Sequence, residues 1–415
     1  MGELAIFGGE PVRKQPFPKF PVFDELERTA INEVLESGVW GGYNPKVTEF
    51  EHAFADFHQA RYGITAANGT VTLETALTAA GIKPGDEVVV PPISFIATAT
   101  AVLRVGSIPV FADIDGRTCN LDPERVRECL TGRTRAMIPV HFAGQPADMD
   151  ELMKIAMEKN LIVIEDCAHA HGASWRGRSV GSIGDFGSFS FQASKNLTAG
   201  EGGFLTTNSE ELAEIARSIC NQGRRTGGEW YEHVRLGTNY RITGWQGAIL
   251  LSQLSRLPKQ LETRAKNAQY LNEALRSFDF ISLPVVDERV TRHSYYLYSI
   301  RLNRGHLSGV SKNLFVEALN AEGIPASAGY PKPLYMNAVF NSHDHRVEEC
   351  PEAERMCADT FWISHEIMLS ETEEIANVVT AMEKVFEGVD TLRSRRGSQP
   401  HNRVPDARYN RKRSA

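Results

Sequence analysis

Lys195 lies in the stretch SFQASKNLTAGEGG, residues 190–203, among hydroxyl, amide and glycine residues at the end of the apolar run FGSFSF. A solvated surface lysine is the ordinary explanation for such an amine. The alternative is chemical, because a lysine amine can form a Schiff base with a carbonyl compound and can carry a proton. Other motifs in the chain are needed to distinguish between the two explanations.

A carboxylate, Asp166, ends the apolar run IVIED. In an open parallel sheet ligands bind beyond the carboxyl ends of the strands, and this residue is expected at such an end. Burial alone raises the pKa of a carboxylate, so an ionised Asp166 needs a cation or an N–H group as its partner. A structural aspartate that caps the following turn would explain the motif equally well.

The stretch ANGTVTLETAL offers an anion site. It places Gly69 and Thr70 at the start of an expected helix, where free backbone N–H groups, a hydroxyl and the positive end of the helix dipole come together. Many helices begin in this way, so the motif is weak by itself.

Combined, these residues fit one cofactor. Pyridoxal phosphate needs a Schiff-base lysine, a carboxylate that keeps its pyridine nitrogen protonated, a phosphate cradle and an aromatic ring stacked on its face. The candidates, in that order, are Lys195, Asp166, Gly69 with Thr70 and Ser190, and Phe95. Fold type I aminotransferases show the same sequence of phosphate loop, aromatic residue, aspartate at a strand end and lysine.

The elements that position these residues alternate between strands and helices. A first helix is expected from residue 24, with Leu26, Ile31, Val34 and Leu35 on one face, and it ends at Gly38. Later strands are apolar on both faces, which calls for a mostly parallel sheet covered on each side. The expected strands and helices are, in chain order, DEVVVPPISF, IPVFADI, DPERVRECL, TRAMIPVHFAG, MDELMKIAMEKN and LIVIEDCAHAHGA.

From residue 186 the pattern changes. Two closely spaced strands, FGSFSFQ and GGFLTTN, are joined by the segment that carries Lys195 and could pair as neighbours. A long helical stretch then leads to a strand, SYYLYSIRL, and a helix, SKNLFVEALNAEG. The fold class is therefore α/β, and the expected parts are an N-terminal arm (1–22), a large cofactor domain (23–260), a small C-terminal domain (261–390) and a basic tail (391–415) expected to be disordered.

Composition limits the partners. The chain has 415 residues, 42% of them apolar, and a net charge of −7, which favours a small-molecule role over binding to nucleic acid or membranes. No signal-peptide core or membrane span is recognisable, so a cytoplasmic protein is expected. The six scattered cysteines are expected to be free thiols, with no metal site.

Five motifs in order resemble the DegT/DnrJ/EryC1/StrS aminotransferase family: AANGTVTLETAL, PPISFIATATAV, EDCAHAHGA, SFQASKNLTAGEGG and LGTNYRITGWQGAIL. The segments LAIFGGEPVR, VWGGYNPKVTEFE, HFAGQPADMD and GYPKPLY are similar to a branch containing L-glutamine:scyllo-inosose aminotransferases and 3-amino-5-hydroxybenzoate synthases. The resemblance implies a pyridoxal 5'-phosphate-dependent fold type I enzyme, aspartate aminotransferase-like.

The resemblance also implies roles for single residues. Lys195 would carry the cofactor and move protons, Asp166 would pair with the pyridinium, and His169 would lie near the ring, although it could simply be hydrogen-bonded at a strand exit. Gly69, Thr70 and Ser190 would bind the phosphate with Asn239 from the partner subunit, which implies a homodimer with shared sites; otherwise Asn239 caps the next helix. Phe95 would stack on the ring, or lie in the core.

Gln192, Arg241, Tyr330 and Tyr335 are candidate substrate residues, each equally explained as a surface or core side chain. The implied reaction transfers an amino group from glutamine or glutamate to a keto-cyclitol or nucleotide-linked keto-sugar in a ping-pong mechanism. A dehydrating and aromatising synthase of the 3-amino-5-hydroxybenzoate type stays open. Relatives that dehydrate sugars have histidine in place of the lysine, and a non-enzymatic regulator would not need the complete cofactor set.

Overall fold

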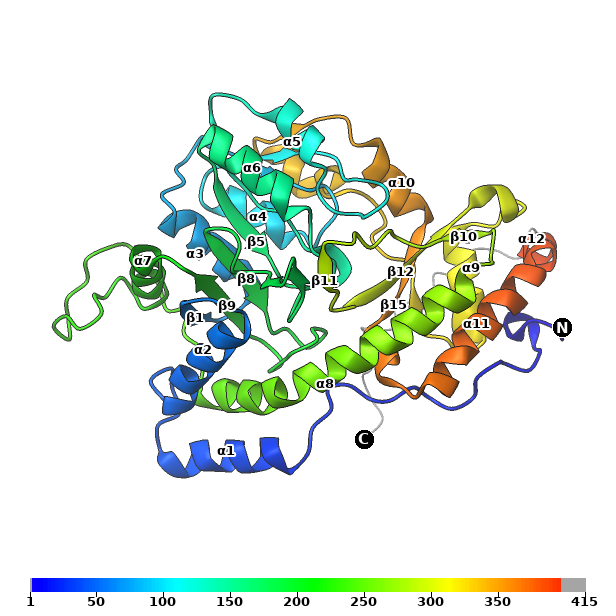
Figure 1. Cartoon of the computed structure of the whole chain (residues 1–415), viewed down its shortest axis with the longest axis horizontal. Helices are drawn as coiled ribbons and strands as arrows, with labels where there is room; N and C mark the ends of the chain where they lie inside the picture. The colour runs from blue at the N-terminus through cyan, green and yellow to red at the C-terminus, as the bar shows by residue number, and fades with distance from the viewer. Residues whose placement is uncertain (1, 397–415) are drawn as a thin grey trace.

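The computed structural model describes residues 2–396, and its centre is an eight-stranded sheet (Figure 1). Only β9 runs antiparallel to the other strands, so the expected mostly parallel sheet is confirmed. The expected pairing of β8 with β9 is also confirmed, with Ser190 opposite Gly203. The strands, in spatial order, are β1 (Tyr62–Ala66), β9 (Gly203–Thr207), β8 (Phe186–Ser190), β5 (Ile162–Asp166), β4 (Thr134–Met137), β2 (Glu87–Val90), β3 (Ile108–Phe111) and β14 (Arg346–Val347).

Helices cover both faces of this sheet because successive strand residues point to opposite sides. Val88 and Val90 pack in the core beneath one group of helices, whereas Val89 packs in the core on the other face. The first group is α3 (Gly69–Ala79), α4 (Ala97–Arg104) and α7 (Glu210–Cys220), and the second is α5 (Pro123–Cys129) and α6 (Met149–Lys159).

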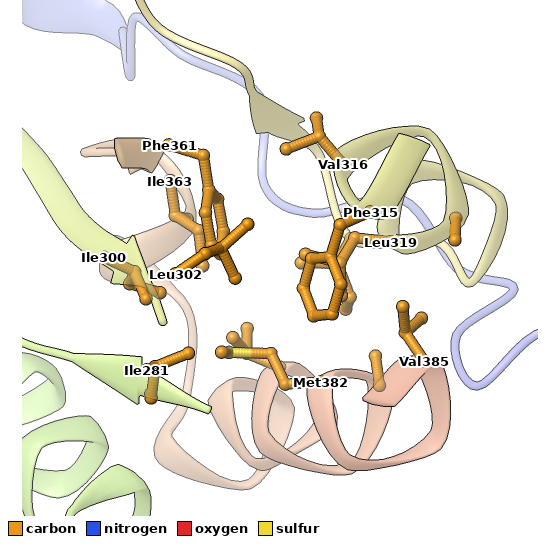
Figure 2. Close-up of a cluster of buried hydrophobic side chains, with 14 of the residues drawn as sticks. Ile281, Ile300, Leu302, Phe315, Val316, Leu319, Phe361, Ile363, Met382 and Val385 are labelled. Carbon is orange, nitrogen blue, oxygen red and sulfur yellow. The ribbon is translucent and has the colours of Figure 1, made fainter. Parts of the chain in front are cut away.

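The small domain is built on an antiparallel sheet whose strands, in spatial order, are β10 (Ile281–Ser282), β12 (Leu297–Leu302), β15 (Thr360–Ser364) and β13 (Ala326–Ser327). Its remaining helices are α9 (Lys312–Ala321), α10 (Pro351–Asp359), α11 (Thr372–Glu387) and α12 (Val389–Arg396). Figure 2 shows Phe315 and Leu319 of α9 facing Met382 and Val385 of α11 across this core.

Helix α8 (Gly244–Leu275) connects the two domains, and in Figure 1 it runs from α2 (Pro45–Phe57) in the large domain to α11 in the small domain. Its N-terminal part packs beside α2. Leu257 and Leu261 lie in the large-domain core, whereas Leu271 and Leu275 lie in the small-domain core. The expected division after residue 260 therefore falls inside a continuous helix.

Two expectations about the chain ends need correction. In α1 (Glu25–Ser37) only Val34 of the expected apolar face is buried, while Leu26 and Leu35 are 52% and 47% exposed. The expected tail does not begin at residue 391, because α12 continues to Arg396 and Leu392 is fully buried. The rest of that basic segment, 397–415, lies outside the described residues.

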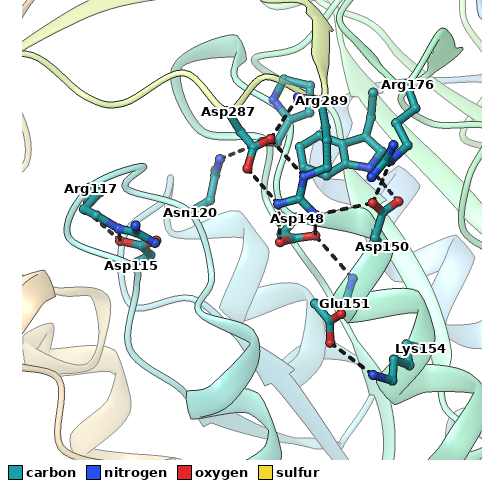
Figure 3. A network of polar contacts seen from close by, with 12 residues as sticks. Asp115, Arg117, Asn120, Asp148, Asp150, Glu151, Lys154, Arg176, Asp287 and Arg289 are labelled. Atoms are coloured by element: carbon teal, nitrogen blue, oxygen red, sulfur yellow. Dashed lines mark hydrogen bonds and ion pairs between the residues drawn. The ribbon is translucent and has the colours of Figure 1, made fainter.

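A polar cluster attaches the segment before β12 to the large domain. This segment includes β11 (Val290–Arg292), which pairs with β6 (Ser174–Trp175), the neighbour of β7 (Arg178–Ser179). Figure 3 shows the Arg289 guanidinium between three carboxylates, and its Nη atoms lie 2.7 Å from Asp148 and Asp287 and 3.3 Å from Asp150.

Within residues 2–396 none of the helices combines the length and the apolar composition that crossing a membrane requires, and this includes the 32-residue α8.

Candidate active site

Asp166 ends β5 at the carboxyl edge of the parallel strands, where it is 5% exposed. Its Oδ2 accepts a hydrogen bond from the Thr98 hydroxyl at 2.8 Å, and Oδ1 accepts one from the backbone N–H of Ala168 at 3.2 Å. Burial raises the pKa of Asp166, and these two bonds and the charge of Lys195 oppose that shift. Among the described residues no cation forms an ion pair with this carboxylate.

Lys195 lies in the turn between β8 and β9 and is 8% exposed. Its backbone N–H donates to the Gln192 carbonyl at 2.8 Å, which closes a tight turn. Its Nζ atom lies 4.5 Å from the centroid of the Tyr296 ring. Because the residue is largely buried, the explanation of a solvated surface lysine is wrong. No carboxylate in the described part of the chain forms an ion pair with this amine.

His169 follows Asp166 on the turn after β5 and is 4% exposed. Its ring stacks on Tyr296, with centroids 4.3 Å apart and planes 30° apart. Burial and the charge of Lys195 hold the pKa of His169 well below its ordinary value, so the ring is neutral. Its Nδ1 is buried without a hydrogen-bond partner among the described residues, which leaves it available to a ligand.

The expected anion site is formed where the start of α3 meets the end of β8, the strand that pairs with β9. A Cβ on Gly69 would lie 2.7 Å from the Ser190 Cβ, so only glycine lets the helix start approach this strand so closely. One part of the expectation is wrong: the Thr70 backbone N–H is not free, because it donates to the Asn68 side chain at 3.1 Å. The Gly69 N–H and the hydroxyls of Thr70 and Ser190 remain as candidate donors.

Phe95 is 60% exposed, so the interpretation as a core residue is wrong. It lies two residues before α4, and its carbonyl accepts a hydrogen bond from the backbone N–H of Thr98, whose hydroxyl contacts Asp166. Phe95 therefore lies one helical turn before Thr98, the residue that hydrogen-bonds to Asp166.

Asn239 is exposed and lies in the segment between α7 and α8. It forms a bridge with Asn221, at the end of α7. It does not cap α8, since Thr243 is the N-cap and forms a capping box with Gln246. Figure 1 shows the chain after α7 projecting from one edge of the large domain.

The four candidate substrate residues differ in what they contact. Gln192 accepts hydrogen bonds from the backbone and side chain of Ser194, beside Lys195. Tyr330 packs against Trp362, at 5.4 Å between centroids. Arg241 donates to Asn221 at 2.7 Å.

Tyr335 lies against Phe111, and its hydroxyl donates to Glu354 at 3.0 Å. The structure therefore places Gln192 beside the lysine, whereas no contact joins Arg241 or Tyr335 to the group around Asp166.

Sequence reasoning missed three residues that hold this group together: Thr98, Tyr296 and His365. Thr98 could have been found from helix periodicity, because it follows the candidate residue Phe95 by three positions, about one helical turn. Tyr296 and His365 come from the small domain, and no spacing in the sequence connects them to Lys195. His365 Nε2 contacts the Ser194 carbonyl at 2.9 Å.

One buried cluster has the composition of a metal site: His141, Glu165 and Cys167. The Ala147 N–H donates to His141 Nδ1 at 3.0 Å, so Nε2 carries the proton and donates to Glu165 at 3.0 Å. Glu165 also accepts the N–H groups of Gly181, Ile183 and Gly184. These donors and acceptors already satisfy one another, which explains the cluster as a structural network. All six cysteines are free and buried, as expected.

The donor set fits pyridoxal phosphate. A pyridinium would supply the cation that buried Asp166 lacks, and the exposed Phe95 and stacked His169 offer aromatic surfaces. The start of α3 with Ser190 offers donors to a phosphate. The fold and this set of residues define an α/β aminotransferase-type enzyme with the fold type I arrangement.

The comparisons agree with this class. The model of the DegT/DnrJ/EryC1/StrS aminotransferase family matches residues 21–383, and the chain belongs to this family, which is pyridoxal phosphate-dependent. A Streptoalloteichus tenebrarius protein provisionally named L-glutamine:3-amino-2,3-dideoxy-scyllo-inosose aminotransferase is 39% identical over 94% of this chain and 99% of its own length. The L-glutamine:2-deoxy-scyllo-inosose aminotransferase of Streptomyces fradiae is 36% identical, covering 92% and 97%.

Solved structures also match this chain over most of its length. The crystal structure of 3-amino-5-hydroxybenzoic acid synthase matches with a TM-score of 0.85 and 33% identity, over 90% of this chain and 100% of that one. An E. coli GDP-4-keto-6-deoxy-D-mannose-3-dehydratase structure with bound hydrated PLP matches with a TM-score of 0.81 and 26% identity, covering 89% and 99%. The chain is thus an enzyme of a sugar and cyclitol aminotransferase family.

Proposed function

We propose that this enzyme transfers an amino group from glutamine or glutamate to a keto-cyclitol or a nucleotide-linked keto-sugar, with pyridoxal phosphate as its cofactor. One observation carries the proposal. Within the described chain, Lys195 has no carboxylate partner and the buried carboxylate of Asp166 has no cationic partner, and the charge of Lys195 acts to lower the pKa of Asp166. The similarity to two glutamine-dependent cyclitol aminotransferases supports the donor and the acceptor class.

When bound, the cofactor would supply an aldehyde for the amine and an electron-withdrawing ring. Lys195 would hold the aldehyde covalently, leave it when the donor arrives, and carry the proton removed from the donor's α-carbon. Asp166 would keep the ring nitrogen protonated, with Thr98 and Ala168 keeping its carboxylate ionised through their hydrogen bonds. Gly69, Thr70 and Ser190 would hold the phosphate.

A ping-pong order follows because the cofactor would store the amino group between the two half-reactions. Lys195 would stay free of the cofactor after the donor's keto product leaves, would move protons in the second half-reaction, and would bind the aldehyde again only when the aminated product leaves. Neutral His169, beside the amine, excludes water from one side without adding a second charge.

The working unit would be a homodimer with shared sites. Asn239 is exposed and caps no helix in its own chain, and it lies in a segment that projects from the large domain. Large apolar side chains remain exposed along residues 22–43 and beside Asn239, and a partner subunit would cover them. They include Phe23, Leu26, Leu35, Trp40, Tyr43, Trp230, Tyr231 and Leu236.

The test begins with the colour of the purified protein. Wild type reconstituted with pyridoxal phosphate should be yellow, with an absorbance band that borohydride abolishes, and Lys195→Ala should lack that reducible band. Lys159→Ala, an exposed lysine at the end of α6, is the matched control and should keep it. The same reducible band in Lys195→Ala would contradict the role of Lys195.

The reaction is then assigned by assay. Glutamine and glutamate are offered with a panel of keto-cyclitols and nucleotide-linked keto-sugars, and amino product is detected by mass spectrometry. The second candidate function is that of a dehydrating and aromatising synthase, and the similarity to 3-amino-5-hydroxybenzoate synthase supports it. Loss of water with formation of an aromatic acid, without amino transfer, would favour this second function.

A further inference from the structure

Tyr296 is held in one orientation beside the lysine amine by contacts on several sides. The residue is 8% exposed and directly precedes β12. The single hydrogen of the Ser194 hydroxyl donates to Gln192 at 2.8 Å, so the Tyr296 hydroxyl must donate to Ser194 Oγ at 3.0 Å. His169 stacks on the ring at 4.3 Å, and His365 lies nearly parallel to it at 5.8 Å.

The Nζ atom of Lys195 lies 4.5 Å from the centroid of this ring. The charged or titratable groups around the amine are Asp166, His169, His171 and His365. Burial holds the three histidines neutral, and Asp166 forms no ion pair with the amine. The Tyr296 ring is therefore the direct partner of the ammonium form of Lys195.

We infer that Tyr296 is a positioning residue that stabilises the ammonium of Lys195 through its aromatic face whenever the lysine is free of the cofactor. The attraction exists only while the amine carries its proton, because it arises between a cation and the ring quadrupole. A group that stabilises the charge developing on a base during proton transfer lowers the barrier of that step without tightening substrate binding. The effect on proton transfer rests on the proposed function, whereas the contact between Lys195 and the Tyr296 ring does not.

Three substitutions distinguish the contribution of the Tyr296 ring from that of its hydroxyl. Tyr296→Phe keeps the aromatic face and loses the bond to Ser194, Ser194→Ala loses that bond and keeps the ring, and Tyr296→Leu loses the ring. Tyr298→Phe is the matched control, because it removes a tyrosine hydroxyl from β12 that contacts Asn272 instead.

The first readout uses the cofactor-free protein. Formaldehyde and cyanoborohydride methylate only the neutral amine, and mass spectrometry follows the peptide that carries Lys195. At about pH 7 Tyr296→Leu should be methylated about tenfold faster than wild type, equivalent to ~1.4 kcal/mol of lost stabilisation of the ammonium, with Tyr296→Phe within about threefold.

A control in pH distinguishes this effect from better access. At about pH 11 an ordinary lysine is mostly neutral, so the excess rate of Tyr296→Leu over wild type should shrink from about tenfold to about threefold or less. Equal rates at pH 7, or a tenfold excess that persists at pH 11, would overturn the inference.

The second readout uses the reconstituted enzyme. Tyr296→Leu should lower kcat about tenfold with KM values unchanged, and an α-deuterated donor should show a larger isotope effect than with wild type, since proton transfer becomes slower. A rise in KM with unchanged kcat would contradict the role. Failure of the proposed function looks different, because wild type itself would then lack the reducible yellow band.

Discussion

Arg264 donates a hydrogen bond from Nη2 to Nδ1 of His365 at 3.0 Å, and neither side chain is more than 1% exposed. Arginine can only donate, so Nδ1 accepts and Nε2 carries the proton that His365 donates to the Ser194 carbonyl. Burial first and the charge of Arg264 second hold the pKa of His365 well below its ordinary value. The structure therefore fixes both the charge and the tautomer of this histidine beside the lysine turn.

The first prediction concerns acid stability. In the unfolded chain His365 takes up a proton below about pH 6.5, whereas the folded protein keeps it neutral, so stability is lost as pH falls below that value. His365→Gln keeps a donor toward Ser194 and cannot take up the proton. We expect the slope of unfolding free energy against pH between about 6 and 5 to fall by up to ~1.4 kcal/mol per pH unit.

Urea unfolding at a series of pH values measures that slope. His306→Gln, a substitution of a half-exposed histidine, is the control and should leave it unchanged. An unchanged slope in His365→Gln would mean that His365 is already protonated in the folded state or that it titrates normally there.

The second prediction concerns Asp166. Burial raises its pKa, so the ionised form is disfavoured in the folded, cofactor-free protein, and this cost is present above the folded pKa and absent below the unfolded one. At pH 7 Asp166→Asn should therefore raise the thermal midpoint of the cofactor-free protein, while turnover falls roughly 100-fold or more because the ring nitrogen loses its counter-charge. Asp56→Asn, on the exposed face of α2, should change neither quantity. Full turnover in Asp166→Asn would exclude the proposed role.

The third prediction concerns the phosphate cradle. In Gly69→Ala the new methyl would lie 2.7 Å from the Ser190 Cβ and 3.3 Å from its hydroxyl oxygen, so the helix start and the strand must separate. Equilibrium dialysis should show about tenfold weaker cofactor binding, ~1.4 kcal/mol. Gly132→Ala meets nothing within 4 Å and should bind as wild type does. Unchanged binding in Gly69→Ala would place the phosphate elsewhere.

The comparison between sequence and structure depends on where each contact originates. Strand and helix periodicity predicted the parallel sheet, the β8–β9 pair and the position of Asp166 at a strand end, because these follow from local patterns. Tyr296 was not predictable in this way. Tyr295, before it, has a φ of 46°, a left-handed conformation that strand alternation does not encode, and this turn decides where Tyr296 points.

Exposure in α1 was unpredictable for a different reason. Periodicity identifies an apolar face but not what covers it, and Leu26 and Leu35 are exposed in the single chain. The Thr70 N–H similarly looks free in the sequence, since only the structure shows that Asn68 accepts it.

The fourth prediction concerns the cluster in Figure 3. Arg289→Leu leaves Asp148, Asp150 and Asp287 facing one another, and we expect the unfolding free energy at pH 7 to fall by roughly 1–3 kcal/mol. Hydrogen bonding to Arg289 lowers the pKa of Asp287 to about 2, so its stabilisation is present above the ordinary value of 3.8 and is lost as pH falls from there toward 2.

The difference between Arg289→Leu and wild type should therefore narrow as the pH is lowered from about 4. Arg176→Leu is the control, because the more exposed Arg176 guanidinium forms an ion pair with Asp150 only among the described residues. This substitution should lower the unfolding free energy by less than Arg289→Leu does. Equal losses in the two variants would show that Arg289 adds nothing beyond a surface ion pair.

The last prediction tests whether Asn239 completes the site of a partner subunit. A phosphate site made of a helix start and serine has neutral donors only, and a further donor from the partner would improve the binding of a dianion. Asn239→Ala alone should abolish most activity, as should Lys195→Ala, because each leaves every site in its homodimer incomplete.

Unfolding and refolding the two inactive chains together forms heterodimers that separate a shared site from a private one. If Asn239 acts across the interface, the Asn239→Ala chain supplies Lys195, the Lys195→Ala chain supplies Asn239, and one of the two sites is intact. Random pairing makes half of the dimers mixed, so roughly a quarter of wild-type activity should return. Differently tagged chains, purified through both tags, should reach about half of wild type on the same reasoning. Tagged heterodimers that are proven by mass and remain inactive would place Asn239 in its own chain's site or outside the site altogether.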